Sequence, residues 1–318
     1  MDIGNCVRMR AQELLSVFAV SALVAVIACS SQKVHRHYGI TVASNFYERP
    51  FHFDCSPAPL QPGSSAFTTG SRQALYARSR SHVLDLPLRA APSLTIAAEL
   101  GNIVEIAASP QDRWIAHYCA TGKGNSPQEA DGNLKKIAMQ QTGSLLTLNS
   151  PGAIGSGRLL LEVPAGAPLT VHSDDPLEIH DLSGPVRVSS LGRAVILKTT
   201  GRVDVWAMAV NFAGSQGSVF LNASRDINFM IAATRFQGSL GANAQHQVNA
   251  YFPAGFQTSV DVLVNRPKDF ICRADFCSKF KKDREGGLYR FTYGDAQSGT
   301  DRIGIRSMAG QVLLATIP

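Results

Sequence analysis

Charged residues are scarce in this sequence, and their scarcity excludes a disordered chain. Asp, Glu, Lys and Arg make up 17% of the 318 residues, whereas apolar residues make up 45%. Disordered chains show the opposite balance, because they lack the apolar surface needed to form a core. The length allows one large core or two smaller ones. The 27 glycines and 16 prolines are typical of a protein built from short strands and turns.

A concentrated positive surface is also missing. The formal net charge is only +6, and no dense series of Lys and Arg is interleaved with aromatic residues. Such a series would be expected on a nucleic-acid-binding surface, so we expect no nucleic-acid partner. The most basic segment, Lys279–Arg284, is predicted to be a solvated loop, with contact to an anionic lipid or glycan as the alternative.

Recognisable catalytic motifs are absent as well. The sequence contains no G-x-S-x-G elbow, no Walker A loop and no Rossmann glycine pattern. We therefore predict a non-enzymatic protein that needs no cofactor.

The N-terminal segment resembles a bacterial lipoprotein leader. Arg8 and Arg10 precede an uncharged apolar segment, Leu14 to Ala28, which is too short to span a bilayer in the usual way. It ends in Val26-Ile27-Ala28-Cys29, which resembles the lipobox, where a small residue admits the signal peptidase and the cysteine thiol carries the lipid. We predict that residues 1–28 are a signal peptide, which would form the one N-terminal signal helix, and that Cys29 is lipidated. An ordinary signal peptide or a single anchoring helix is the alternative.

Each of these interpretations places the rest of the chain outside the cytoplasm. Ser30, and not Asp, follows Cys29, which is typical of sorting to the outer membrane. The expected location is therefore the cell envelope, with the lipid on Cys29 as the membrane contact. An envelope protein, a surface protein or a glycan is the expected partner.

Four cysteines remain after Cys6 in the leader and Cys29 at its end. An oxidising compartment allows disulfides between them. The short spacing of Cys272 and Cys277 suggests one bridge, which leaves Cys55 and Cys119 for another. The CxxxxC segment has no further Cys or His close by, so a disulfide is favoured over zinc, and no metal is predicted.

Residues 29–92 show no sustained periodicity and are predicted to be a tether with little order. The stretch SPAPLQPGSS at 56–65 is typical of a linker. One strand is expected at Val83–Leu88. His35 and His37 have a spacing that could hold a metal, but a polar linker explains them better.

Alternating apolar residues begin at Ser93, which we take as the start of a single domain extending to residue 318. The segment 126–141 is the one convincing helix candidate outside the leader. Ser126 is its predicted N-cap, Pro127 suits the first helical position, and Glu129 has the capping-box spacing. Residues Lys135–Gln140 are compatible with a strand.

A short repeat then extends through the middle of the chain. Gly184, Gly192 and Gly201 punctuate the stretch GPVRVSSLGRAVILKTTGRVDVW, and short apolar pairs start near residues 177, 186, 195, 203, 210, 219 and 227. One strand and one turn fill each interval, so two intervals make a coil of about 16–18 residues. This pattern predicts an all-β fold, a single-stranded right-handed β-helix or β-solenoid-like stack. An antiparallel β-sandwich is the alternative.

The turns of the repeat do not suggest calcium binding. Calcium-binding β-rolls need a carboxylate at a fixed position in each turn, because a hard cation requires oxygen ligands. Here the turns contain LSG, SLG, TTG and SQG, which supply no recurring carboxylate.

The segment HSDDPLEIHD at 172–181 is the most site-like part of the sequence. Polysaccharide hydrolysis requires two carboxylates at a defined separation, and this segment contains the tightest acidic cluster. A solvated Asp-Pro turn between two strands explains it better, with a glycan-binding or polysaccharide-cleaving site as the alternative. The candidate residues are His172, Asp174, Asp175, Glu178 and His180.

Several segments, taken in order, resemble the bacterial putative-adhesin domains. The matching segments are LTIAAELGNIVEI (94–106), SPQEADGNLKKI (126–137), VPAGAPLTVHS (163–173), GPVRVSSLGRAVILKTTGRVDV (184–205) and IGIRSMAGQVLL (303–314).

The resemblance implies an extracytoplasmic β-solenoid-like domain of uncharacterised function over residues 93–318. Such domains occur on lipoproteins or behind a membrane anchor, and the family supplies no catalytic residues. Its turns contain Ser-Gly-Asp, whereas this chain has LGR and TGR, so a shared ligand does not follow. The implied role is that of a surface adhesin or scaffold.

Overall fold

The computed structural model describes Cys55 and residues 76–85, 93–111, 113–150, 152, 154–294 and 300–317. The chain divides into two units, Met1–Pro50 and Phe51–Pro318, and all of the described residues belong to the second. The predicted signal peptide, Cys29, the His35/His37 pair and most of the predicted tether lie outside the described residues.

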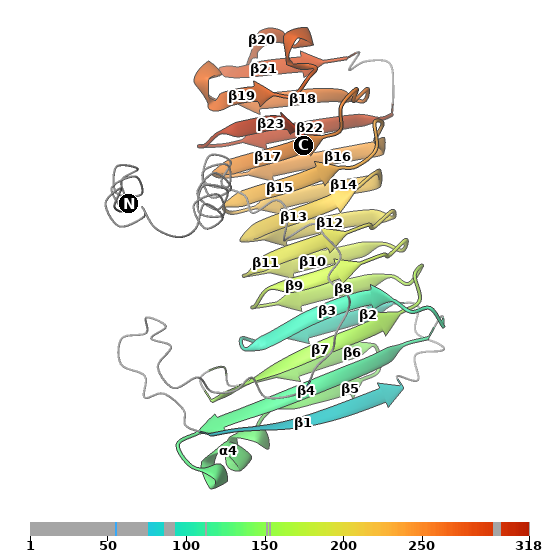
Figure 1. The fold of residues 1–318 in the computed structure, drawn as a ribbon, viewed down its shortest axis with the longest axis vertical. Coiled ribbons are helices and arrows are strands. Elements are labelled where there is room, and N and C mark those ends of the chain that lie inside the picture. The colour runs from blue at the N-terminus through green and yellow to red at the C-terminus, as the bar shows by residue number, and fades with distance from the viewer. Residues whose placement is uncertain are drawn as a thin grey trace, which may run out of the picture. The chain divides into compact units, whose positions relative to one another are not determined.

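The described part of the chain is all-β and forms two sheets, as the sequence predicts. One sheet has eleven strands and the other has twelve (Figure 1). In spatial order, the eleven-stranded sheet contains β1 (Tyr76–Asp85), β4 (Ile115–Gly124), β7 (Gly155–Val163), β3 (Asn102–Ala108), β9 (Leu177–His180), β11 (Arg193–Leu197), β13 (Ala209–Gly214), β15 (Asp226–Ile231), β17 (Gln247–Phe252), β23 (Val312–Thr316) and β19 (Phe270–Arg273).

The twelve-stranded sheet faces it with a matching series of strands. Its spatial order is β20 (Lys281–Glu285), β21 (Leu288–Tyr293), β18 (Ser259–Val264), β22 (Arg302–Ser307), β16 (Gln237–Ala244), β14 (Gln216–Ala223), β12 (Arg202–Ala207), β10 (Val186–Ser190), β8 (Leu169–Ser173), β2 (Leu94–Ala98), β6 (Leu145–Asn149) and β5 (Ala138–Thr142).

The predicted repeat corresponds to a stack of parallel coils. From β8 to β17, successive strands alternate between the two sheets, and each strand up to β15 pairs in parallel with the strand two places later. In the twelve-stranded sheet, Leu169, Val186 and Val203 are successive register partners. The spacing of these partners matches the predicted coil length. Parallel pairing through the repeat supports the stacked-coil prediction over its antiparallel alternative.

The core is the space between the two sheets. Alternation along each strand turns every second side chain inward, and parallel register aligns these side chains from coil to coil. The aligned inward positions are almost fully buried. In the twelve-stranded sheet they are Ile96, Val171, Val188, Val205, Leu221, Ala242, Ile305 and Val262, and in the eleven-stranded sheet they include Ile106, Ile179, Ile196, Phe212, Phe229, Ala250 and Leu314.

The repeat glycines lie where the turns of neighbouring coils make close backbone contact. A Cβ atom on Gly201 would lie 2.3 Å from the carbonyl oxygen of Ser183 and 2.5 Å from that of Gly184. A Cβ atom on Gly184 would likewise lie 2.5 Å from the carbonyl oxygens of Gly166 and Ala167. The glycine spacing is therefore a requirement of coil stacking.

The N-terminal end of the stack begins before residue 93, the predicted domain boundary. β1 pairs antiparallel with β4 along its whole length, so the sheet includes part of the predicted tether. The expected strand at Val83–Leu88 is replaced by this longer strand, which starts at Tyr76.

One α-helix, α4 (Pro127–Leu134), lies at this end of the stack and matches the predicted start. The Ser126 side chain accepts a 3.1 Å hydrogen bond from the backbone N–H of Glu129, and the Glu129 carboxylate accepts one from the N–H of Asn125. The helix ends earlier than the predicted 126–141, and β5 occupies its last part, where Lys135–Gln140 had suggested a strand. On β4, burial raises the pKa of Tyr118 to about 12, while the charge of Arg80 opposes the shift.

The C-terminal coil is inserted inside the stack and does not lie at its end. β22 pairs with β16 on one side and β18 on the other, and β23 lies in the same way between β17 and β19. The outer coil ends in a cluster of aromatic side chains beside two short 3-10 turns, η1 (Pro267–Asp269) and η2 (Cys277–Lys279). This cluster closes the core with Phe252, Phe256, Phe270, Phe276, Phe280, Phe291 and Tyr293.

Candidate functional site

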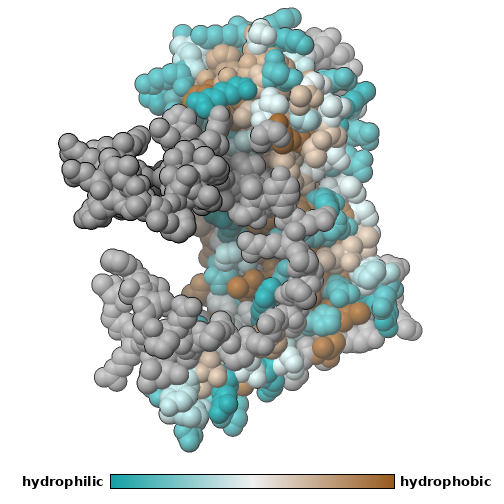
Figure 2. All heavy atoms as spheres, in the orientation of Figure 1, coloured by the Kyte–Doolittle hydropathy of each residue, from teal (hydrophilic) through white to brown (hydrophobic). Residues whose placement is uncertain are grey.

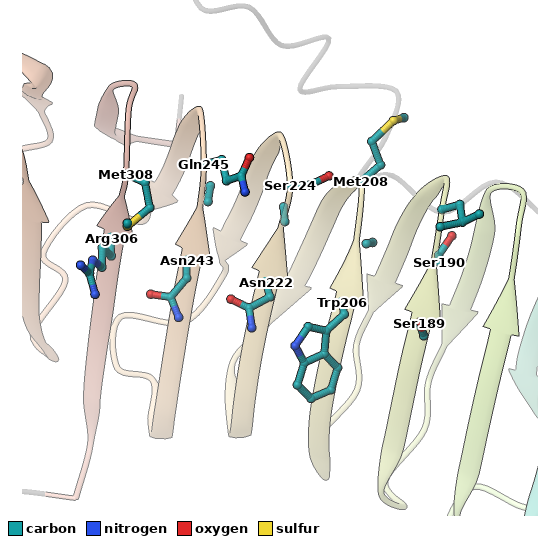
Figure 3. A pocket seen from close by; sticks show the side chains of 14 residues that line it. Ser189, Ser190, Trp206, Met208, Asn222, Ser224, Asn243, Gln245, Arg306 and Met308 are labelled. Carbon is teal, nitrogen blue, oxygen red and sulfur yellow. The ribbon is translucent and has the colours of Figure 1, made fainter.

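The outer face of the twelve-stranded sheet carries a row of aligned polar and aromatic side chains. Because Val203 and Val205 on β12 point into the core, Trp206 points outward. The parallel register places one outward residue of each neighbouring strand beside it (Figure 3). The row, across β10, β12, β14, β16 and β22, is Ser189, Trp206, Asn222, Asn243 and Arg306.

This row forms the floor of a shallow cleft of about 750 Å³. The turns that follow the strands form one rim, where Leu191, Met208 and Met308 have exposed fractions of 72%, 39% and 50%. These apolar side chains come from three different coils, so the rim depends on the stacking as well as on local sequence.

Two exposed aromatic rings lie together in this region. Trp206 is 43% exposed and Phe220 on β14 is 37% exposed, and their ring centroids lie 6.0 Å apart in an edge-to-face arrangement. Beyond Phe220, the register partners are Gly241 and then Gly304. The Phe220 ring lies over Gly241, because a Cβ atom there would meet the ring at 3.3 Å, whereas Gly304 leaves the next position without a side chain.

Most carboxylates on the outer face are already paired with arginines. Asp204 lies 2.9 Å from Nε of Arg202. Asp261 lies 2.7 Å from Arg290, and its hydrogen bonds and charge raise the pKa of that guanidinium. Arg306 has no ion-pair partner among the described residues. The row therefore ends in an unneutralised positive charge.

The structure divides the predicted 172–181 cluster between two outer faces. His172 points outward from β8 and is the register partner of Ser189, so it continues the row on the twelve-stranded sheet. Glu178 and His180 belong to β9 of the other sheet. The chain crosses from one sheet to the other in the turn between these strands.

Asp174 and Asp175 lie in that turn. The Asp175 carboxylate accepts a hydrogen bond from the backbone N–H of Gly101, and the Ser173 hydroxyl donates to the Asp175 carbonyl at 2.9 Å. Asp174 is exposed. These contacts assign Asp175 to turn stabilisation, so the acidic residues of the segment do not converge on one cleft as paired hydrolytic carboxylates would.

Glu178 and His180 do approach a third ligand-type side chain, Glu105 on β3. Their potential ligand atoms lie within 4.8 Å of one another, and His180 Nε2 lies 3.0 Å from Glu178 Oε1. Such a set can bind a divalent metal. Here Nη2 of Arg158 lies 3.1 Å from Glu105 and supplies a positive charge. Each of these side chains therefore already has a polar partner in the structure, and the expectation of no metal stays a prediction.

The four predicted disulfide cysteines are paired in the structure. Cys55 bonds to Cys119 on β4, and Cys272 bonds to Cys277. The first bond fastens part of the predicted tether to the eleven-stranded sheet. The second closes the turn beside the aromatic cluster.

The basic segment Lys279–Arg284 is mostly a strand and not a loop. It contributes β20, an edge strand whose five residues are all exposed. Hydrophilic side chains gather over this end of the stack in Figure 2. Charged residues on an exposed edge oppose pairing with a second chain, which is a sufficient reason for this composition.

Sequence reasoning missed the cleft residues, although one signal was present. Alternation from Val203 and Val205 already places the large side chain of Trp206 on the outer face of the sheet, where it does not pack in the core.

No protein-family model and no curated protein matches the chain. Among solved structures, it is similar to a putative cell adhesion protein from Clostridium sporogenes ATCC 15579 at 10% identity and TM-score 0.28, over 76% of this chain and 100% of that one. It is also similar to a putative adhesin from Bacteroides fragilis NCTC 9343 at 11% identity and TM-score 0.30, over 77% of this chain and 98% of that one. Values this low transfer no function, so the proposals below rest on this chain's own residues.

Proposed function

We propose that this protein is a non-enzymatic, adhesin-like interaction module of the bacterial cell envelope. It binds its partner through the cleft on the outer face of the twelve-stranded sheet. The observation that carries the proposal is the exposed Trp206 at the floor of that cleft, with the exposed ring of Phe220 against it at the edge of the row.

An exposed aromatic pair on a sheet needs an explanation other than folding. Water contact with a large apolar side chain costs about 25 cal/mol per Å² of its surface, and the described part of the chain leaves 43% of Trp206 and 37% of Phe220 exposed. Trp is among the residues that most often dominate binding energy, and a site built on strands holds its side chains rigidly. The cleft therefore has the properties of a preorganised binding surface.

The anchoring part of the proposal rests on the sequence. Arg8, Arg10, the apolar segment and the lipobox-like Ala28-Cys29 support export and lipidation at Cys29. In the part of the chain that the structure describes, no helix is long and apolar enough to cross a membrane. A lipid on Cys29 would hold the cleft-bearing domain at the envelope, with the outer membrane as the proposed location.

Cys29→Ala is expected to abolish lipid attachment, because the thiol that accepts the diacylglycerol is removed. Expression in a diderm bacterium with an alkyne fatty acid should label the wild-type protein and not the variant. Mass spectrometry of the mature N-terminus should show a lipidated Cys29. An unmodified Cys29 or an uncleaved leader would contradict lipid anchoring without affecting the cleft.

Trp206→Ala is expected to lower retention of the purified protein on washed bacterial envelope material by at least about tenfold, a loss typical of a central binding aromatic. Retention is measured by co-sedimentation over a concentration series. Tyr76→Ala is the matched control, because Tyr76 is 44% exposed on β1, far along the stack from the cleft. It should bind like the wild type.

Equal retention of both variants would contradict binding through this cleft. Thermal unfolding of each variant shows whether a lost signal reflects lost folding. Trp206 is exposed, so its replacement should leave the melting temperature nearly unchanged.

A further inference from the structure

We infer that the partner of this cleft is an acidic polysaccharide, bound as an extended chain along the row from Ser189 to Arg306. This inference rests on the proposed function and adds the chemical class of the ligand and the role of each side chain.

The direction of the row favours an extended polymer. It crosses five neighbouring parallel strands, and strands in a sheet lie about 4.8 Å apart, so the row is about 19 Å long. The cleft is shallow and extends across these strands, with an apolar rim on one side and, on the other, Phe220 over Gly241 followed by Gly304. A linear chain of several sugar units fits such a surface, whereas a compact small molecule would leave most of it empty.

The two amides in the row have unused hydrogen-bonding capacity. Within the described residues, neither Asn222 nor Asn243 has a side-chain hydrogen-bond partner. The opposite sheet provides a contrast, because Asn228 donates to Asn211 at 2.9 Å and Asn249 donates to Asn228 at 2.9 Å. Each free amide offers donors and an acceptor, which matches the hydroxyl groups of a sugar.

The aromatic side chain beside these amides completes a carbohydrate-type surface. The Trp206 ring, 43% exposed, presents apolar area next to Asn222. A pyranose ring has an apolar C–H face and polar edges. It can therefore stack on the indole while its hydroxyls reach the amides. A protein partner of the usual kind would instead require a more apolar centre than this Ser-Trp-Asn-Asn-Arg floor.

The charge at the end of the row selects an acidic chain. Arg306 is exposed and adjoins Asn243, and the carboxylates of Asp204 and Asp261 on the same face are already held by Arg202 and Arg290. A guanidinium binds a carboxylate or sulfate through paired charged hydrogen bonds. Arg306 lies three strands, or about 14 Å, from Trp206, so a uronate or sulfated sugar a few units along the chain from the one on Trp206 would place its anionic group at Arg306.

The test measures binding of the purified full chain to polygalacturonate, alginate and hyaluronate, with dextran and xylan as neutral polymers. Affinity electrophoresis and calorimetry both give dissociation constants. We expect binding to at least one acidic polymer and at least tenfold weaker binding to the neutral ones. Arg306→Gln should weaken acidic-polymer binding by about tenfold and remove most of its salt dependence. Arg113→Gln, an exposed arginine outside the cleft, should change neither.

The outcomes separate the inference from the proposed function. Equal binding of acidic and neutral polymers, unaffected by Arg306→Gln, would overturn the acidic class. Failure to bind any of these polymers, with Trp206-dependent retention on envelope material after periodate treatment, would overturn the carbohydrate ligand and leave the proposed function standing. If Trp206→Ala bound like the wild type both to the polymers and to envelope material, the inference and the proposed function would be overturned together.

Discussion

A chain that ends after residue 301 is expected to lose its native fold. The truncation removes β22 and β23, which are interior strands with a partner on each side. Their side chains at Ile303, Ile305, Val312 and Leu314 are at most 2% exposed, and their loss would leave a gap through both sheets. Burying a single Ile or Leu side chain contributes about 1.5–3 kcal/mol, so four exceed the whole stability margin of many domains.

Circular dichroism and limited proteolysis measure this result. The truncated chain should show no cooperative thermal unfolding and should be digested under conditions in which the full chain survives. The control replaces the five exposed residues of β20 with a Gly/Ser sequence, and it should keep a cooperative transition because β20 is an edge strand with one partner. A truncated chain that unfolds cooperatively near the wild-type temperature would contradict the interior position of the last coil.

Gly201→Ala is expected to lower the free energy of unfolding by about 3 kcal/mol, a large value for the addition of one methyl group. The new Cβ would lie 2.3 Å from the Ser183 carbonyl oxygen, and backbone atoms of an adjacent coil cannot rotate away as a side chain can. The two coils would have to separate locally, which would strain their hydrogen bonds.

Urea unfolding of Gly201→Ala and of the control Gly166→Ala measures this effect. Gly166 lies in a turn of the same stack, but a Cβ there would have nothing within 4 Å. The control should therefore differ from the wild type by less than about 1 kcal/mol. Similar stability losses in both variants would show that turn flexibility, and not coil contact, explains the glycines.

The coil period was predictable from the sequence because it is a local property. Each strand and turn fits within eight or nine residues, and the inward positions of β10, β11 and β12 alternate visibly. The order of the coils was not predictable in the same way. β6 and β7 lie nearer the N-terminal end of the stack than β2 and β3, and β22 and β23 are inserted between β16/β17 and β18/β19. Their inward residues nevertheless resemble those of every other coil.

The cleft shows the same limit. Alternation could place Trp206 outward, but only the register of three further strands aligns it with Asn222, Asn243 and Arg306. The 172–181 segment shows the converse. His172 and Glu178 are close in sequence, yet the turn between β8 and β9 sends them to different sheets, as the favoured Asp-Pro turn between two strands implies. Proximity along the chain therefore does not by itself bring side chains to one surface, whereas register joins distant segments in the row.

The most direct measurement of the central claim is the fluorescence of Trp206 during titration with an acidic polysaccharide. The chain contains two tryptophans, and Trp114→Phe leaves Trp206 as the single reporter. We predict a saturable change in its emission with polygalacturonate or another acidic polymer that binds, because a sugar ring of that polymer covers the exposed indole. Dextran at the same concentrations should cause no change. A polymer that binds by calorimetry without any change in Trp206 emission would contradict binding along this row.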